Sequence, residues 1–248
     1  MMFKLLLSFA ALFLTVTGNL LASKVGLLIV ATGKYDQFVE PLIQSARKHF
    51  CADQEVTYFV FANGNIPQAD DIVHVYQNKL GWPYDTMMRN AIYNQHKELF
   101  TAQDYLFALD ADMLFVDTVG SEILGERVAT LHPGYVGTLG TYETDPLSLA
   151  CVGDDEGEGY FAGGFFGGSR EEFLKIISIT TLRILDDLSR DIIAIWHDES
   201  HWNRYCIDHP PTVVLSPSYC SPDALEVEYP KKLIALDKDH DEVRSDDI

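Results

Sequence analysis

The sequence is poor in positive charge. Of its 248 residues only 18 are Lys or Arg, against 37 Asp or Glu, which gives a formal net charge of −19. Proteins bind nucleic acids and anionic membrane surfaces through an excess of positive charge on the protein. The negative net charge of this chain therefore argues against both kinds of binding through its overall electrostatic field. An anionic substrate needs a metal ion or a few individually placed cations. Each Lys or Arg near a motif is therefore informative.

Cysteine is also scarce, and its spacing excludes zinc fingers and Cys-x-x-Cys redox sites. The four cysteines, Cys51, Cys151, Cys206 and Cys220, are scattered along the chain. In a chain of this size we expect them to be buried thiols. If the protein is exported they could also form a disulfide, whose connectivity the spacing leaves open.

Long apolar runs are absent except at the N-terminus. Lys4 precedes a nearly continuous apolar run from Leu5 to Val16, the form of a secretory signal peptide. The run is shorter than the roughly 20 residues of a bilayer-spanning helix. However, Leu20–Ala22 extends it, so an uncleaved N-terminal anchor is the alternative. We expect residues 1–23 to make the protein exported or membrane-associated, and residues 24–248 to form one catalytic domain, since no repeat or linker divides them.

Short apolar runs alternate with helical apolar spacing along the chain. We expect strands at Val25–Ala31, Val56–Ala62 and Ile72–Tyr76, and helices at Tyr35–Phe50, Thr86–Phe100 and Glu171–Asp191. In the last helix, Leu182 and Leu185 belong to the predicted buried face. This order predicts an α/β fold with a mainly parallel, Rossmann-like central sheet flanked by helices. Ligands of such sheets bind beyond the carboxyl ends of the strands.

Two carboxylates interrupt an apolar run in the middle of the chain. Tyr105–Phe115 (YLFALDADMLF) reads as a strand buried on both faces, with Asp110 and Asp112 at its end. Unpaired buried carboxylates are costly, so we expect the strand to deliver them to a cleft where a cation lies between them. Oxygen ligands suit a hard cation such as Mn²⁺ or Mg²⁺, with positions left for phosphate oxygens. A surface turn is the competing interpretation, which the apolar flanks disfavour.

Three later segments also stand out. The glycines of Gly163–Gly168 (GGFFGG) permit close backbone approach, either to a ligand or to a neighbouring strand, and a tight turn is an equal alternative. Trp196–His201 (WHDESH) is too polar for a core and too aromatic for a free loop, which indicates a site. From Lys231 the chain is highly charged, and by itself this predicts a mobile acidic tail.

The motifs at residues 30–35, 87–89, 109–112, 130–134, 163–168, 196–201 and 215–217 resemble glycosyltransferase family 6, in the right order, and the resemblance covers Lys24 to Arg244. This is the family of the blood-group A and B transferases and the α-1,3-galactosyltransferases. The resemblance implies a GT-A fold. It also implies transfer of N-acetylgalactosamine or galactose from a UDP-sugar to the 3-OH of a galactoside, with retention and Mn²⁺ assistance. Compared with the Golgi members, we expect the catalytic domain to follow the N-terminal apolar segment directly, without their long stem; both metal-binding aspartates are kept.

The resemblance also implies roles for individual residues. Glu199 would lie beneath the anomeric carbon, and Arg89 would hold Asp110 and the donor sugar. The metal ligands would be Asp110 and Asp112. Donor contacts would come from Val30, Ala31, Tyr35, Trp82, Arg89, Ala162, Gly163, Gly164, Lys238 and Arg244. Acceptor contacts would come from His132, Thr141, Trp196 and Asp198, with Trp196 stacking on a galactose face.

In the blood-group transferases of the family that this chain resembles, small residues near the donor's C2 substituent leave room for an acetamido group. Ala162, Gly164 and Gly134 occupy the relevant positions, so UDP-N-acetylgalactosamine is the expected donor, with UDP-galactose as the competitor. The expected acceptor is a galactoside glycan that can carry fucose. Two other functions remain open on the same fold: a carbohydrate-binding protein without turnover, and a nucleotide-sugar hydrolase. The intact Asp110, Asp112, Glu199 and Arg89 weigh against the first. The acceptor contacts His132 and Trp196 weigh against the second.

Overall fold

The structure is a computed structural model that describes residues 22–244. Its strands are β1 (Lys24–Val30), β2 (Glu55–Ala62), β3 (Ile72–Tyr76), β4 (Tyr105–Asp110), β5 (Met113–Phe115), β6 (Arg127–Leu131), β7 (Phe161–Ser169), β8 (Val213–Leu215), β9 (Ser221–Pro222) and β10 (Leu233–Ala235). Its α-helices are α1 (Val39–His49), α2 (Tyr84–Met87), α3 (Arg89–Gln95), α4 (Arg170–Ser189), α5 (His197–Asp208) and α6 (His240–Val243). The predicted signal peptide or anchor lies outside the described residues, apart from its last two positions. Across residues 22–244, the structure contains no helix with the length and apolarity of a membrane span.

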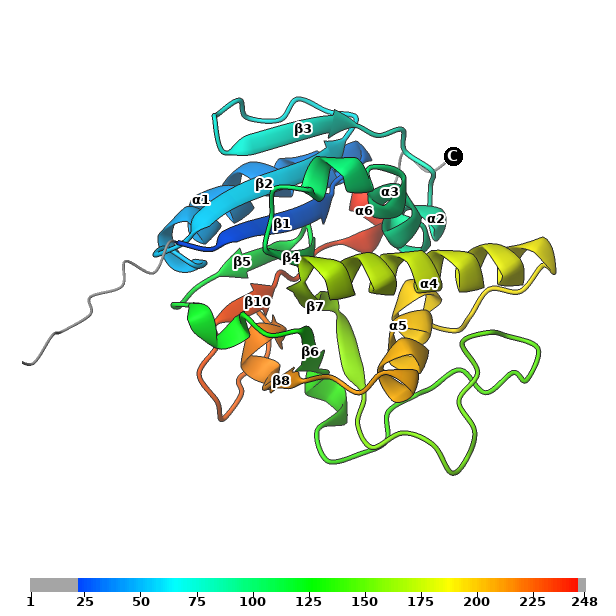
Figure 1. Cartoon of the computed structure of the whole chain (residues 1–248). Helices are drawn as coiled ribbons and strands as arrows, with labels where there is room; N and C mark the ends of the chain where they lie inside the picture. The colour runs from blue at the N-terminus through cyan, green and yellow to red at the C-terminus, as the bar shows by residue number, and fades with distance from the viewer. Residues whose placement is uncertain (1–21, 245–248) are drawn as a thin grey trace, which may run out of the picture.

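A seven-stranded sheet in the order β3-β2-β1-β4-β7-β6-β8 organises the described chain (Figure 1). The pairs from β3 to β4 are parallel, as is the β6–β8 pair, whereas β7 runs antiparallel to both of its neighbours. A small second sheet, β5-β10-β9, brings the C-terminal segment beside the end of β4. The predicted α/β class with a mainly parallel central sheet is confirmed.

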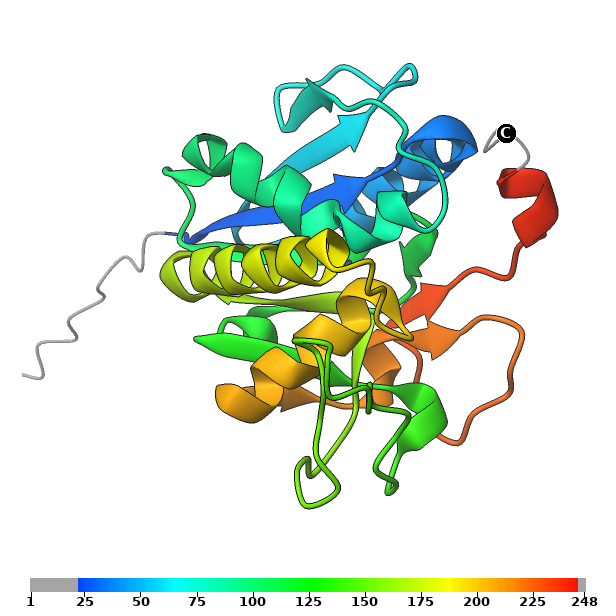
Figure 2. The same ribbon diagram turned by 90° about the vertical axis from the view of Figure 1, so that its right-hand side faces the viewer.

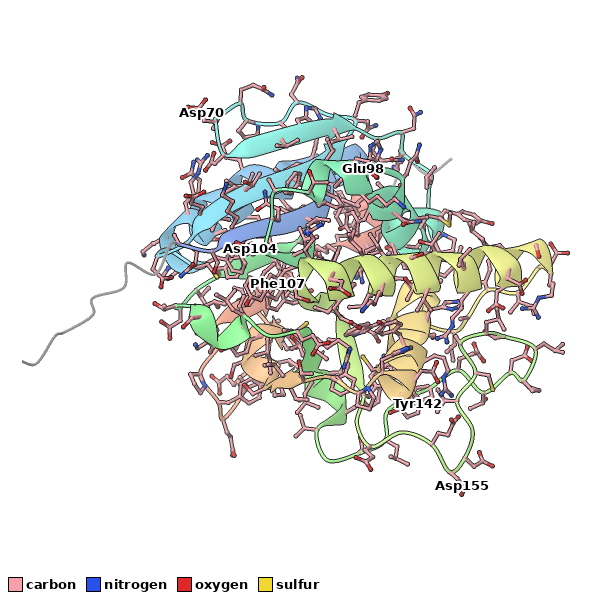
Figure 3. All side chains as sticks on the ribbon, viewed as in Figure 1. Asp70, Glu98, Asp104, Phe107, Tyr142 and Asp155 are labelled. Atoms are coloured by element: carbon pink, nitrogen blue, oxygen red, sulfur yellow. The ribbon has the colours of Figure 1, made fainter. Side chains whose placement is uncertain are left out.

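Alternate residues of the central strands serve two cores. On β4, Phe107 and Leu109 pack on the face covered by α1, and Leu106 and Ala108 pack on the face covered by α3, α4 and α5. Figure 3 shows the labelled Phe107 within the layers of the molecule. Because both faces are covered, the central strands are almost uniformly apolar, which is why they could be read from the sequence.

Two predicted helices are interrupted in the structure. Over Tyr35–Phe50, a 3₁₀ helix (Gly33–Phe38) precedes α1, and Pro41 lies in the first turn of α1, where a missing N–H costs little. Over Thr86–Phe100, α3 is flanked by α2 and by a 3₁₀ helix (Lys97–Phe100), with breaks at Met88 and His96, where ψ is near zero. The apolar spacing correctly predicted helical segments in both ranges, but it does not indicate where an α-helix changes to a 3₁₀ helix or breaks.

The predicted buried face of the Glu171–Asp191 helix is only half right. Phe173 and Ile177 are buried, but Leu182 and Leu185 are 66% and 46% exposed. Figure 1 shows the reason, since the C-terminal part of α4 extends beyond the sheet. The buried residues of that part are Thr180, Thr181, Ile184 and Asp187.

The glycine-phenylalanine segment forms the interior of β7 rather than a turn. Phe165 and Phe166 are fully buried and belong to opposite cores. A Cβ at Gly167 would lie 2.2 Å from the Leu106 carbonyl oxygen, so this glycine permits the close approach of β4.

The C-terminal segment is ordered to residue 244, so the prediction of a mobile tail is wrong for the described part. Lys232 accepts at its carbonyl from Val116, β10 pairs with β5, and Asp239 caps α6. The four cysteines are free thiols; Cys51 and Cys206 are buried as expected, whereas Cys151 and Cys220 are partly exposed.

Candidate active site

The two predicted metal ligands lie at the carboxyl end of the central strand β4. β4 stops at Asp110, a turn carries Ala111 and Asp112, and β5 begins at Met113. The predicted continuous strand is therefore broken at the aspartates. The Asp110 side chain is 44% exposed and that of Asp112 only 11%. Burial and the neighbouring Asp110 raise the pKa of Asp112, and its ion pair with Lys238 opposes this.

A cavity of about 230 Å³ opens beside these carboxylates. Its lining includes eight of the predicted donor and metal residues: Val30, Tyr35, Trp82, Arg89, Asp110, Asp112, Lys238 and Arg244. The Lys238 ammonium lies 5.8 Å from the Tyr35 ring centroid, and the Arg244 guanidinium lies 3.6 Å from that of Trp82. The C-terminal segment therefore brings two cations onto two aromatic rings of the cavity.

Arg89 connects this cavity to a second hollow. Its guanidinium lies 2.5 Å from both Asp110 Oδ1 and Asp198 Oδ2, and Nη2 donates to the Gly163 carbonyl at 2.6 Å. Arg89 is only 5% exposed. Burial lowers the pKa of Arg89, but Asp198 and Asp110 raise it by more, so the guanidinium remains charged. Removing one partner of such a buried pair leaves an uncompensated charge, which costs about 3–5 kcal/mol.

The second hollow contains the predicted catalytic carboxylate. It is lined by Arg89, Asp110, Gly163, Gly164, Trp196, Asp198, Glu199 and Thr86. Glu199 Oε2 accepts a hydrogen bond from the Gly163 N–H at 2.7 Å. Burial raises the pKa of Glu199 to about 7, opposed by the Gly163 N–H and by the hydroxyl of Tyr160. That hydroxyl is buried and has no hydrogen bond of standard geometry within residues 22–244. Asp198 is 2% exposed, and burial raises its pKa to about 6 despite Arg89.

An irregularity in the pairing of β7 with β6 leaves the Gly163 backbone available to bind Glu199 and Arg89. On β6, Ala129 pairs with Phe166 and the next residue, Thr130, pairs with Ala162. Residues 163–165 are therefore skipped by the β6 ladder, and the Gly163 N–H and C=O face Glu199 and Arg89 instead. A Cβ at Gly163 would lie 3.0 Å from Arg89 Nη2, so a side chain there would disturb the contact. Bulges of this kind commonly redirect groups beside active sites.

Helix α5 begins with a strained turn. His197 has φ +53°, a left-handed value that is costly for a residue with a side chain. Its ring packs edge-on against Trp82 at 5.0 Å between centroids. The first turn of α5 thereby contacts the loop that carries Trp82, while Asp198 and Glu199 lie against Arg89 and β7.

Several predicted residues lie outside both hollows. His132 and Thr141 belong to an aromatic group with Tyr135 and Tyr160: the His132 ring packs on Tyr135, and the Tyr135 hydroxyl lies 2.8 Å from Thr141 Oγ1. Gly134 lies against the His132 ring. This group joins the two ends of the long connection between β6 and β7, since His132, Tyr135 and Thr141 lie near its start and Tyr160 is its last residue. The connection extends away from the sheet below α5 (Figures 1 and 2). Figure 3 shows Asp155 at its outer tip.

Two predicted donor residues are fully enclosed. Ala31 is 0% and Ala162 is 1% exposed. The Ala31 amide already donates to the Phe61 carbonyl at 2.9 Å, so of the pair Val30–Ala31 only Val30 lines the cavity.

Sequence reasoning missed the residues that support the site. Thr32 donates to Asp85 at 2.9 Å, and Asp85 also accepts from the Leu80 and Gly81 amides, which shapes the Trp82 loop. Tyr160 and Asn203 contact Glu199. Asn203 follows Glu199 by one helical turn, a spacing that could have identified it.

The residues present fit a divalent cation that also binds a ligand. Within residues 22–244 no group of three or more His, Cys, Asp or Glu side chains gathers to form a closed metal site. Asp110 and Asp112 are oxygen donors at one edge of the cavity, and Mg²⁺-like ions are commonly held by one or two carboxylates together with substrate phosphates and water. Lys238 already pairs with Asp112, which shows that this carboxylate accepts a cation.

Comparisons with known proteins agree with this geometry. The chain is 36% identical over 239 residues to histo-blood group ABO system transferase 1 of Rattus norvegicus, covering 89% of this chain and 68% of that protein. It is 33% identical over 239 residues to globoside alpha-1,3-N-acetylgalactosaminyltransferase 1 of Gallus gallus (89% and 69%). It is 30% identical over 230 residues to alpha-1,3-galactosyltransferase 2 of Homo sapiens (85% and 67%). The family model of glycosyltransferase family 6 matches residues 9–245. This chain therefore belongs to glycosyltransferase family 6 and is a hexosyltransferase.

Proposed function

We propose that the enzyme transfers N-acetylgalactosamine, or less efficiently galactose, from a UDP-sugar to the 3-OH of a galactoside, forming an α-1,3 bond with retention. The observation that carries this proposal is the position of Arg89. It is shared by the aromatic cavity, where Asp110 lies, and by the hollow of Glu199 and Asp198. A nucleotide in the first and a sugar in the second would meet at this residue.

The nucleotide would occupy the cavity with its uracil against Tyr35. Asp110 and Asp112 would hold Mn²⁺, with Mg²⁺ as a substitute, and the ion would neutralise the negative charge that develops on the departing UDP. Lys238 and Arg244 would add positive charge on the same side. In a chain with net charge −19, such local cations are needed to bind and release a diphosphate.

The acceptor would approach over the exposed Trp196, which is 45% exposed and suited to stack on a galactose face. Asp198 would accept from a sugar hydroxyl while Arg89 keeps it ionised. His132 and Thr141 would contact more distant parts of the acceptor, since they lie on the connection that extends below α5.

Two routes to retention are compatible with Glu199. In the first, its carboxylate attacks the anomeric carbon as UDP leaves, and the acceptor hydroxyl then displaces it. In the second, the acceptor attacks from the face that UDP leaves, and Glu199 stabilises the positive charge of the oxocarbenium-like state. Both routes require the carboxylate to be ionised and held against the sugar, and the hydrogen bond from Gly163 N–H supports this by favouring the charged form and fixing the side chain.

We also propose that residues 24–248 form the catalytic domain and that residues 1–23 direct export or anchor the chain. If the segment is a cleaved signal, N-terminal sequencing will find a mature chain that begins near Ser23 or Lys24. An intact Met1 on chains that pellet with membranes will identify an anchor.

The test of the proposed function is a matrix of donors and acceptors, assayed with and without Mn²⁺. UDP-N-acetylgalactosamine and UDP-galactose are each combined with a fucosylated and an unfucosylated β-galactoside, and both UDP release and the product linkage are measured. We expect an α-1,3-linked product that depends on the metal. UDP release at the same rate without acceptor would indicate a hydrolase. Sugar binding without UDP release would indicate an inactive binding protein.

A further inference from the structure

One buried asparagine fastens α5 to β7. Asn203 is 1% exposed, its Oδ1 accepts from the Phe161 N–H at 2.8 Å, and its Nδ2 donates to the Phe161 carbonyl at 2.9 Å. The same Nδ2 also donates to the Glu199 carbonyl at 2.9 Å. Both amide hydrogens and the amide oxygen are thus used, which makes this a fully satisfied polar group inside the protein.

The asparagine joins the two segments that must be aligned for catalysis. Phe161 lies two residues before Gly163, whose N–H binds the Glu199 carboxylate, and Asn203 lies one turn after Glu199 on α5. The backbone of Glu199 is therefore held through Asn203, and its carboxylate is held through Gly163. Both attachments are made to the same short stretch of β7. This stretch has left its β6 ladder at residues 163–165, so the ladder does not fix its position there.

We propose that Asn203 is a positioning residue that sets the register of α5 on β7 and so aims the Glu199 carboxylate at the donor sugar. The inference rests on the proposed function of Glu199. It goes further in assigning the alignment to a side chain that touches neither hollow. A displacement of about 1 Å between a catalytic group and its target reduces the rate by about 10²-fold. A single side chain that sets such an alignment is therefore expected to act on turnover much more than on nucleotide affinity.

The same helix supplies a matched control. Tyr205 follows Asn203 by two residues, is buried, and donates to Glu172 Oε1 at 2.6 Å, which attaches α5 to α4 rather than to β7. Tyr205→Phe removes one buried hydrogen bond of α5 without touching the contact with β7. It reports what a general weakening of the helix does.

The experiment compares Asn203→Ala, Asn203→Ser and Asn203→Asp with Tyr205→Phe in the full-length enzyme. Asn203→Asp keeps the shape and the acceptor for Phe161 N–H but cannot donate to the two carbonyls. For each variant, Tm, the Kd for UDP, kcat, and the pH dependence of kcat are measured. We expect the Asn203 variants to lower kcat by about 10–10²-fold with an unchanged Kd for UDP. The acid limb of kcat should move to higher pH, because a misaligned carboxylate loses the Gly163 hydrogen bond. Tyr205→Phe should lower Tm and leave kcat and the pH profile unchanged.

Two results would overturn the proposal: wild-type kcat in the folded Asn203 variants, or a loss of kcat that follows Tm equally in the Asn203 and Tyr205 series. Amide hydrogen exchange at Gly163 gives a readout independent of activity. It should be faster in Asn203→Ser than in Tyr205→Phe, and equal protection in the two variants would contradict the proposal even if Asn203→Ala does not fold. If the wild-type chain transferred no sugar, the proposed function would fail, but the exchange comparison would still decide whether Asn203 aligns α5 on β7.

Discussion

The proposed nucleotide side and the proposed transfer side of the site are built differently. The nucleotide side, Tyr35, Trp82, Asp112, Lys238 and Arg244, comes from loops, a 3₁₀ helix and the C-terminal segment. The transfer side, Arg89, Gly163, Asp198, Glu199 and Asn203, comes from α3, β7 and α5, and its polar groups are bound to one another.

Burial also differs between the two sides at their outer residues, although Asp112 on the nucleotide side is itself buried. Trp82 is 44% exposed, whereas Arg89, Asp198 and Asn203 are at most 5% exposed. Segments that must open for nucleotide exchange need few buried contacts, while groups that stabilise a developing charge act best when they are already in place. Variants on the transfer side should therefore change turnover, and variants on the nucleotide side should change binding as well.

The largest effect is expected at the centre of the transfer side. Glu199→Gln keeps the size of the side chain but removes its charge. The attraction between residue 199 and the anomeric carbon then no longer strengthens as that carbon becomes positive in the transition state. We expect kcat to fall by about 10³-fold, the upper range for one preorganised electrostatic group, with UDP affinity unchanged. Steady-state kinetics and calorimetric UDP binding test this. A parallel loss of UDP binding would instead make Glu199 a structural residue.

The next effect concerns the charge that the nucleotide side supplies. Asp112→Asn, or EDTA on the wild-type enzyme, should reduce transfer by at least about 10²-fold, because the leaving diphosphate loses its main stabiliser. Unlike Glu199→Gln, this variant should also weaken UDP binding. Asp117→Asn, an exposed aspartate just after β5, is the control and should behave as wild type. Full activity in EDTA would exclude the metal-assisted reaction.

A smaller effect is expected from donor selectivity. A Cβ at Gly164 would lie 3.1 Å from Cys220 Sγ and 3.3 Å from Asp110 Oδ2, so Gly164→Ala crowds the wall between the two sides. We expect it to shift the ratio of kcat/KM for the two donors toward UDP-galactose by about tenfold, the scale of one methyl group in a pocket. Adding Cys220→Ala should relieve the crowding and restore part of the ratio. A wild-type preference for UDP-galactose would show that other residues set the selectivity.

The smallest effect tests whether the Tyr160 hydroxyl interacts with the Glu199 carboxylate. The Tyr160 hydroxyl lowers the pKa of Glu199, which burial raises to about 7. Tyr160→Phe removes this stabilisation of the charged form, so the pKa of Glu199 should rise and the acid limb of kcat should move to higher pH. A full hydrogen bond of about 0.5–1.5 kcal/mol corresponds to a shift of roughly half a unit to one unit, and we expect less here because the Tyr160 hydroxyl makes no hydrogen bond of standard geometry within residues 22–244. Tyr142→Phe, whose hydroxyl binds the Gly159 carbonyl, is the control. An unmoved pH profile for Tyr160→Phe would exclude the interaction.

The nucleotide side was the easier one to predict from the sequence. Asp110 and Asp112 were conspicuous because charged residues followed an apolar run, and the parallel strands implied that the cavity lies at their carboxyl ends. Lys238 and Arg244 were informative because cations are few. The sequence pattern alone predicted a mobile tail there. The resemblance to the family indicated that Lys238 and Arg244 contact the donor, and the structure brings both residues to the cavity.

The sequence by itself determined the α/β class, the central strands and the carboxylates at the strand ends, because apolar spacing and charge are local properties of the chain. Tertiary structure alone decided that Arg89 joins Asp110 to Asp198, that β7 leaves its ladder at Gly163, and that Asn203 locks α5 to β7. Each of these is a contact between segments 21 to more than 100 residues apart or a shift in strand pairing. Such contacts depend on which backbone groups remain unpaired once the sheet has formed, and no local pattern records that.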